Sequence, residues 1–339
     1  MTNYMYVSLQ GEDKVLLFTT DPVTGSPTLQ TVIPISGGPA PIAVDPPLRH
    51  LYIGRRGSKQ VSSFAIDQST GRLTMTGTVP LETDPCFLST DRKGRFLLAS
   101  YYEGAMVTIH PLNHDGAVGA PPVEVRPTAR GAHSIQTDPS NRFAFVPHIA
   151  GRGPNQILQF RFDEQTGHLT PNLPPKVVPP RLDGPRHFCF HPRLDILYFS
   201  NEQGCSVTGY NFDPLGGTLS PFQTVSTLPA GYTGQNSCSK IQIAPSGKFL
   251  YAPNRGHNSI AGFAVDPTNG RLTALGQTPS ETIPRAFSLD PAGNFLYSAG
   301  FESGRLAAFR VDPDTGKLIP QGIYPLGARP MWVRTFSLG

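Results

Sequence analysis

The chain has 339 residues, of which 15% are charged, with a formal net charge of +4 and a pI near 8.9. The positive excess is small and scattered, which argues against a nucleic-acid partner but suits a small anionic ligand. No apolar run approaches the length of a membrane span and no basic-then-apolar leader is present, so we expect a soluble cytoplasmic protein without a membrane partner. Glycine and proline, 35 and 36 residues, favour many turns over long helices.

A hairpin-like element recurs seven times along the chain. Each copy consists of a strand, a turn rich in Asp, Pro, Thr and Gly, and a second strand. In chain order the copies are FTTDPVTGSPTL (18–29), FAIDQSTGRLT (64–74), IHPLNHDGAVG (109–119), FRFDEQTGHLT (160–170), YNFDPLGGTLS (210–220), FAVDPTNGRLT (263–273) and FRVDPDTGKLI (309–319). Because these turns recur as connections, we predict that their aspartates are structural and carry no chemistry.

A second hairpin-like element alternates with the first. Its copies are IAVDPPLRHLYIG, LSTDRKGRFLLAS, IQTDPSNRFAFVP, FCFHPRLDILYFS, IQIAPSGKFLYAP and FSLDPAGNFLYSA. Its turn position is occupied successively by Asp45, Asp91, Asp138, His191, Ala244 and Asp290, at intervals of 46 to 53 residues. Two hairpins in a unit of this length give four short antiparallel strands, which is typical of a β-propeller blade.

The two ends of the chain together supply the four strands of one blade. Residues 3–32 supply three strands of a blade, and GARPMWVRTFSLG (327–339) matches the innermost strand that they lack. We therefore predict an all-β, seven-bladed β-propeller with four antiparallel strands per blade, forming a single domain over residues 1–339. Pairing of the N- and C-terminal strands in one blade would close the ring. We expect two longer connections, 170–185 and 228–238, to act as lids or pocket walls.

Aligning the repeats by their turns compares equivalent positions in the seven blades. At the start of the innermost strand the chain places Ala40, Cys86, His133, Arg186, Ser239, Arg285 and Met331. At the end of the second strand it places Leu9/Gln10, Arg55/Arg56, Tyr101/Tyr102, His148/Ile149, Asn201/Glu202, Asn254/Arg255 and Gly300/Phe301. Both positions belong to one rim of the ring. A propeller does not require ionisable side chains there, so their concentration around a narrow axis predicts a functional site.

Four cysteines, Cys86, Cys189, Cys205 and Cys238, show no CxxC pair and no metal-like spacing with histidine. We expect reduced thiols in or near the core, and no metal site.

Several motifs in register resemble the seven-bladed lactonase family, which includes propeller-type 6-phosphogluconolactonases and fungal carboxy-muconate cyclases. These motifs are GAHSIQTDP, GPRHFCFHP…LYFSNE, IAPSGKFLYAPNRGHNSIAGF, PRAFSLDPAGNFLYSAG and GARPMWV, and the resemblance covers essentially the whole chain. It implies a lactonase that needs no cofactor. In the cyclase branch a histidine, a glutamate and two arginines are proposed to form the active site. The motifs place these four on His133, Glu202, Arg186 and Arg255.

Opening a lactone needs an activated water, a group that holds the oxyanion, and a proton for the leaving alkoxide. Glu202 and His133 are the candidates for base and acid, in either order, and the two arginines offer planar donors for an anion. We expect the substrate to be a small anionic lactone of the sugar-acid type, such as 6-phosphogluconolactone. Six further residues are candidates for substrate binding: Arg285, His148, Asn201, Asn254, Lys240 and Arg55.

Two alternatives remain open at this point. The same groups suit lactonisation of a muconate, and a propeller can also be a non-catalytic scaffold, although no broad exposed patch marks one. We interpret His187 and His191 as structural, with side chains that face the neighbouring sheet or the turns of the far rim. The sequence allows a monomer or a homodimer.

Overall fold

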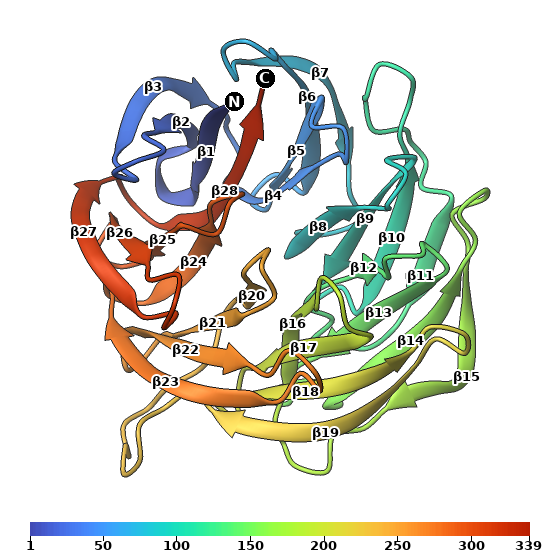
Figure 1. The fold of residues 1–339 in the computed structure, drawn as a ribbon. Helices are drawn as coiled ribbons and strands as arrows, with labels where there is room; N and C mark the ends of the chain where they lie inside the picture. Colours follow the sequence, from blue (N-terminus) through green and yellow to red (C-terminus); the bar gives the residue numbers. More distant parts are fainter.

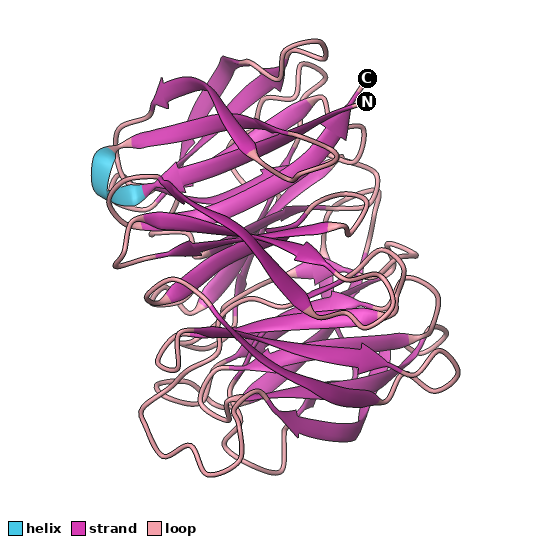
Figure 2. Cartoon of the chain, turned by 60° about the vertical axis from the view of Figure 1, so that its left-hand side comes forward, coloured by secondary structure: helices cyan, strands magenta, loops and turns pink.

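The computed structural model describes residues 1–339 as seven four-stranded antiparallel sheets arranged in a ring (Figure 1). The strands nearest the axis are β4, β8, β12, β16, β20, β24 and β28, and the other strands of each sheet follow outward. The single helical element is a 3-10 turn, η1 (Gln10–Glu12), which lies at the edge of the ring in Figure 2. The predicted seven-bladed propeller is confirmed.

Each sheet runs from an innermost strand at the axis to an outermost strand at the circumference. In that order, the closing blade consists of β28 (Pro330–Leu338), β1 (Thr2–Leu9), β2 (Lys14–Thr20) and β3 (Pro27–Pro34). The next three consist of β4 (Pro39–Val44), β5 (His50–Arg55), β6 (Gln60–Ile66), β7 (Leu73–Pro80); β8 (Phe87–Thr90), β9 (Phe96–Tyr101), β10 (Met106–Pro111), β11 (Glu124–Pro127); and β12 (Gln136–Thr137), β13 (Phe143–His148), β14 (Gln156–Phe162), β15 (Leu169–Val177). The last three consist of β16 (Pro185–Phe190), β17 (Ile196–Asn201), β18 (Ser206–Asp213), β19 (Thr218–Ser226); β20 (Gln242–Ile243), β21 (Phe249–Asn254), β22 (Ser259–Val265), β23 (Leu272–Pro279); and β24 (Pro284–Leu289), β25 (Phe295–Gly300), β26 (Arg305–Val311), β27 (Leu318–Pro325).

The ring is closed in the way the chain ends predict. β28 pairs antiparallel with β1 from Thr2 opposite Leu338 to Leu9 opposite Pro330. The closing blade therefore joins the two ends of the sequence, and both termini lie together in Figure 2. This pairing leaves no open sheet edge between the first and the last repeat.

Buried tyrosines of the second strands join successive blades. The hydroxyl of Tyr251 in β21 donates to the carbonyl of Gly316 in the next blade at 2.7 Å. The hydroxyl of Tyr297 in β25 does the same to Gly25 of the closing blade at 2.8 Å. These glycines end the Asp/Pro/Thr/Gly turns and have positive φ, and a Cβ at Gly25 would lie 2.3 Å from the ring of Phe295. The recurrent turn thus needs glycine for its backbone conformation and for blade packing.

The aspartates of the second type of turn hold the hairpin backbone. Asp138 is buried, and one of its carboxylate oxygens accepts the amide hydrogens of Arg142 and Phe143, both at 2.8 Å. The other oxygen accepts from the amide of Ser140 at 2.9 Å. This supports the prediction that the turn aspartates are structural.

Replacing Asp138 by alanine is expected to lower the free energy of unfolding by about 1–3 kcal/mol, because buried amides lose their acceptor. The value of kcat/KM should stay within twofold of the wild type, since the turn lies on the rim opposite the candidate site. Thermal unfolding and an activity assay measure the two quantities. Asp67→Ala, at an exposed turn, is the control and should shift the unfolding temperature less. An Asp138→Ala protein of unchanged stability would contradict the assignment.

One of the two predicted wall segments is shorter than the sequence indicates. Residues 169–177 form β15, so only residues 178–184 connect that blade to the next. Segment 228–238 is a connection between β19 and β20, as expected. Its last residues reach the candidate site, because the carbonyls of Ser237 and Cys238 both accept hydrogen bonds from the Arg255 side chain.

Candidate active site

The start of the innermost strand is where the blades meet around the axis. A small cavity of about 20 Å³ lies there, enough for about one water molecule. Six of the seven residues that occupy this position in the aligned repeats line it, each from a different blade. The lining residues are Ala40, Pro41, Arg56, Cys86, His133, Arg186, His187, Lys240, Arg285, Met331 and Trp332.

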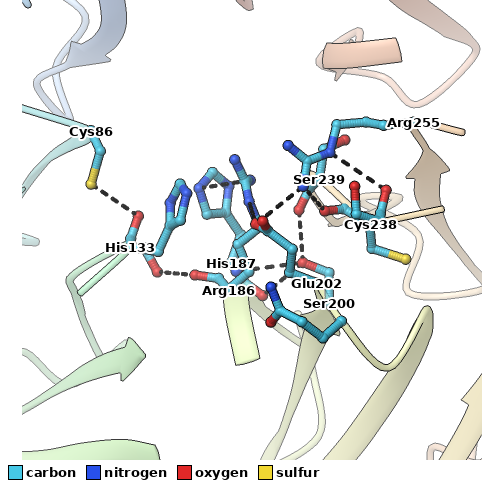
Figure 3. Close-up of polar contacts among 12 residues, drawn as sticks. Cys86, His133, Arg186, His187, Ser200, Glu202, Cys238, Ser239 and Arg255 are labelled. Carbon is cyan, nitrogen blue, oxygen red and sulfur yellow. Dashed lines mark hydrogen bonds and ion pairs between the residues drawn. The ribbon is translucent and has the colours of Figure 1, made fainter. Parts of the chain in front are cut away.

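A buried ion-pair cluster lies beside this cavity (Figure 3). Glu202 follows β17, and its Oε2 accepts from the Nε of Arg186 at 2.6 Å. The same oxygen lies 3.1 Å from an Nη of Arg255, which follows β21. The Arg186 side chain is only 3% exposed, and those of Glu202 and Arg255 are 16% and 13% exposed. Three of the four predicted catalytic residues are therefore in direct contact, and Oε1 of Glu202 is left without a protein partner.

Backbone contacts fix this cluster in place. The amide of Glu202 donates to the carbonyl of Gly184 at 2.7 Å, and the carbonyl of Glu202 accepts from the amide of Cys238 at 3.2 Å. Arg255 donates from Nη2 to the carbonyl of Cys238 at 2.8 Å. The hydroxyl of Ser134 in the preceding blade donates to the carbonyl of Arg186 at 3.0 Å. Contacts from three blades thus hold the charged side chains before any ligand arrives.

His133 and His187 complete the cluster. Their rings lie 5.2 Å apart, edge to face, and Tyr102 lies 5.9 Å from the ring of His133. Nη1 of Arg186 lies 3.2 Å from Nε2 of His187, so this nitrogen accepts and Arg186 donates. Nδ1 of His133 is buried and has no hydrogen-bond partner. His133, the fourth predicted catalytic residue, is therefore connected to the ion pairs through His187.

The prediction that His187 faces the neighbouring sheet or the far rim is wrong. The register of β16 against β17 shifts between Pro185 and His187, which leaves Arg186 in a β-bulge. Strict alternation would put consecutive side chains on opposite faces. The bulge instead brings both Arg186 and His187 to the axial cavity. His191 follows the prediction, since its ring contacts the far-rim turn at Gly247.

Positive charge exceeds negative charge at this rim. Arg285 in β24 makes no ion pair, and burial together with the neighbouring cations Arg186 and Arg255 lowers its pKa to about 9. Arg56 lines the cavity and pairs with Asp84 at 2.7 Å. Burial lowers the pKa of Arg186 to about 10, opposed by the charge of Glu202. The guanidinium groups of Arg285 and Arg186 therefore stay protonated at neutral pH, so the rim attracts anions.

The candidate acid–base groups each have one dominant protonation state at neutral pH. Burial raises the pKa of Glu202, but Arg186 and Arg255 outweigh it and lower the pKa below its ordinary value, so the carboxylate stays ionised. Burial and the cation of Arg186 hold the pKa of His133 and that of His187 well below their ordinary value. Both imidazoles are therefore neutral, and the site offers proton acceptors rather than acids.

Acidification below pH 6.5 is expected to destabilise the fold, because buried neutral histidines have lowered pKa values. For His148, whose pKa is lowered to about 4, the unfolded chain binds a proton at pH 5 that the native state does not. This histidine alone lowers the free energy of unfolding by about 2 kcal/mol at pH 5 relative to pH 7. Thermal unfolding between pH 7 and 5 measures the slope. His148→Gln should flatten it, while the exposed His168→Gln should not. A constant unfolding temperature over this range would contradict the argument.

The six predicted substrate-binding residues divide into two groups. Arg285 and Lys240 line the small cavity. The other four lie away from it. Each is the last residue of a second strand, directly before the residue at the rim, and adjacent residues of a strand point to opposite sides. Asn201 donates to Ser206 and Thr208, Asn254 donates to Thr227, His148 is fully buried with Nδ1 at the carbonyl of Val146, and Arg55 donates to Ser36. No contact in the structure supports a substrate-binding role for these four residues.

The structure also places aromatic residues at the axis that sequence reasoning did not select. Trp332 of β28 lines the small cavity, and its ring lies 3.6 Å from Nζ of Lys240. Phe87 lies 5.7 Å from the Trp332 ring and 5.0 Å from that of His187. Trp332 is the only tryptophan of the chain, and it directly follows Met331, which occupies the aligned position at the start of the innermost strand. This position could have identified Trp332 as a residue of the axial site. These aromatic rings and Lys240 separate the small cavity from a larger one on the far side.

Metal-ligand clusters and membrane-spanning helices are not found in the molecule. No three His, Cys, Asp or Glu side chains cluster closely enough to hold a metal ion. No helix is long and apolar enough to cross a membrane. All four cysteines are free thiols, as expected.

Comparison with known proteins identifies the family. The sequence profile described as "Lactonase, 7-bladed beta-propeller" matches residues 1–83 and 38–335. A 6-phosphogluconolactonase of Pectobacterium carotovorum subsp. carotovorum (strain PC1) is 36% identical over 251 residues, which is 74% of either chain. A 6-phosphogluconolactonase of Serratia proteamaculans (strain 568) is 32% identical over 250 residues, again 74% of either chain. The solved structure of a Pseudomonas aeruginosa periplasmic gluconolactonase superposes with a TM-score of 0.92 over the whole of both chains, at 24% identity, and so shares the fold. This chain therefore belongs to the lactonase family of seven-bladed β-propellers, and it is a lactonase.

Proposed function

We propose that the chain hydrolyses a small anionic sugar-acid lactone of the 6-phosphogluconolactone type. The observation that carries the proposal is the excess of guanidinium groups around Glu202 at one rim of the axis. A phosphorylated lactone brings the negative charge that this rim lacks. The names of the curated relatives support the same substrate class.

In the proposed reaction, Glu202 is the group ready to accept a proton. Its Oε2 is held by Arg186 and Arg255, which leaves Oε1 to draw a proton from an attacking water. The neutral imidazole of His133, with its free Nδ1, is a second acceptor beside it. In this scheme one of the two draws the proton from the water, and that proton is then returned to the leaving alkoxide.

The arginines have separate tasks in this scheme. Arg186 is held at Nε by Glu202 and at Nη1 by His187, so its remaining donors are oriented before the substrate arrives. Such a preorganised donor stabilises the oxyanion of the tetrahedral intermediate. Arg285 has no anionic partner and suits the phosphate or hydroxyl-rich end of the substrate. His187 acts as a positioning residue because it fixes the Arg186 fork.

A substrate panel tests the proposal. Acid release is followed at constant pH with 6-phosphogluconolactone and glucono-δ-lactone, and absorbance with muconates. The phosphorylated lactone is expected to show the highest kcat/KM, and the unphosphorylated one a raised KM. Conversion of a muconate without lactone hydrolysis would favour the cycloisomerase alternative, and turnover of none of these compounds would overturn the proposal.

A further inference from the structure

A second and much larger cavity lies on the axis beyond the candidate active site. Its volume is about 430 Å³, and it extends toward the rim of the Asp45 and Asp91 turns. His187, Lys240 and Trp332 line both this cavity and the small one, so they form the wall between the two. We call this larger space the lower cavity. None of the residues Arg186, Glu202, Arg255 and Arg285 lines it.

Two cations without an anionic partner face this space. Lys240 is only 7% exposed, and its ammonium makes neither a hydrogen bond nor an ion pair; its Nζ lies over the Trp332 ring, 3.6 Å from the ring centroid. Arg334 of β28 likewise has no side-chain hydrogen bond or ion pair, and its Nε is buried without an acceptor. Burying a charge without a partner costs several kcal/mol per ion, which is comparable to the net free energy of unfolding of a whole domain. A bound anion would supply the charge and the hydrogen-bond acceptors that these two side chains lack.

The carboxylates that line the lower cavity do not supply the missing charge. Asp45 accepts from Nδ1 of His50 at 2.8 Å and from two backbone amides of its turn. Asp91 accepts from the amide of Phe96 at 2.8 Å and from the side chain of Asn141 at 2.9 Å. Burial and the nearby cations Arg334 and Arg186 lower the pKa of Lys240, and no carboxylate opposes them, so an anion bound beside Lys240 would stabilise its ammonium form.

We propose that the lower cavity is a binding site for a small phosphate dianion, either inorganic phosphate or a phosphate monoester, held between Lys240 and Arg334. An ammonium and a guanidinium together match the charge of a phosphate dianion and supply donors to its oxygens. The volume lies within the range of small-molecule sites and exceeds that of phosphate alone, so a sugar-sized monoester also fits. The site lies across the shared wall of His187, Lys240 and Trp332 from the proposed hydrolytic one, and the proposal does not depend on that function.

The fluorescence of Trp332 reports directly on this site, because Trp332 is the only tryptophan of the chain and contacts Lys240. The experiment titrates the full chain with inorganic phosphate and with glucose 6-phosphate, and follows tryptophan fluorescence. Glucose and potassium chloride at matched ionic strength are the controls. A saturable change with phosphate or the monoester, and none with the controls, is expected. Equal affinity for both compounds would identify free phosphate as sufficient, and tighter binding of glucose 6-phosphate would identify a monoester.

Matched variants locate the bound anion. Arg334→Gln should weaken binding at least tenfold, and Arg310→Gln, an exposed change on β26, should leave it unchanged. Arg285→Gln alters only the small cavity and should also keep the wild-type Kd. Because Arg334 is only half-buried and has no anionic partner, Arg334→Gln should unfold at the same or a higher temperature without phosphate, and Lys240→Met gives a second test of binding. Absence of saturation, or loss of binding in Arg285→Gln but not in Arg334→Gln, would overturn the proposal.

Discussion

Replacing Glu202 by glutamine is expected to lower kcat/KM by about 10³-fold, because the proton acceptor and the charge that aligns two arginines are lost together. Glutamine keeps the size of the side chain but leaves Arg186, which is 3% exposed, without its 2.6 Å ion pair. Removing one partner of a buried ion pair destabilises a protein by about 3 kcal/mol or more. Hydrolysis of 6-phosphogluconolactone and thermal unfolding, measured on the same preparation, separate the two effects.

A matched control exists on the same rim. Glu103 pairs with Arg130 at 2.6 Å, but its side chain is 52% exposed. Glu103→Gln is therefore expected to keep kcat/KM within twofold and to change stability little, since solvated ion pairs contribute little. A folded Glu202→Gln enzyme with kcat/KM within tenfold of the wild type would show that Glu202 is not the proton acceptor.

Substituting Arg186 by alanine is expected to lower kcat/KM at least 10³-fold, and Arg186→Lys should recover only about tenfold of that loss. The guanidinium donates to Glu202 from Nε and to His187 from Nη1, and a single ammonium cannot occupy both positions. If the free donors hold the oxyanion, most of the loss falls on kcat. Steady-state kinetics with 6-phosphogluconolactone measures kcat and KM separately.

The exposed Arg271→Ala is the control for a general loss of positive charge and should leave both constants unchanged. A full recovery of activity by Arg186→Lys would show that Arg186 contributes charge only. An Arg186→Ala effect confined to KM would assign it to substrate binding instead of the oxyanion.

The repeat allowed the sequence to predict the cluster as well as the fold. His133 and Arg186 occupy equivalent positions of two neighbouring blades, and so do Glu202 and Arg255. A closed ring converts equivalent positions into a circle of neighbours, which is why the prediction brought them to one rim. Their ion pairs then follow from the geometry of that rim.

The direction of individual side chains was less predictable. Alternation along a strand explains why Arg56 reaches the axial cavity while Arg55 donates to Ser36. For His187 the obstacle was the bulge at Arg186, because the residues around it carry no signal for an extra residue. Lys240 was predicted at the substrate site, but it also lines the lower cavity together with Arg334. The absence of an anionic partner for these two cations is visible only in the structure.

The pairing of β28 with β1 makes the order of synthesis important for this protein. Ser337 donates to Asn3 across 334 positions of sequence, so the first strand emerges from the ribosome long before its inner neighbour exists. At about 5–20 residues per second, roughly half a minute passes while β1 has one edge unpaired. The nascent chain must keep that apolar edge from other chains during this interval. A chaperone that covers the first hairpin should therefore raise the yield of folded protein more than one that acts after release.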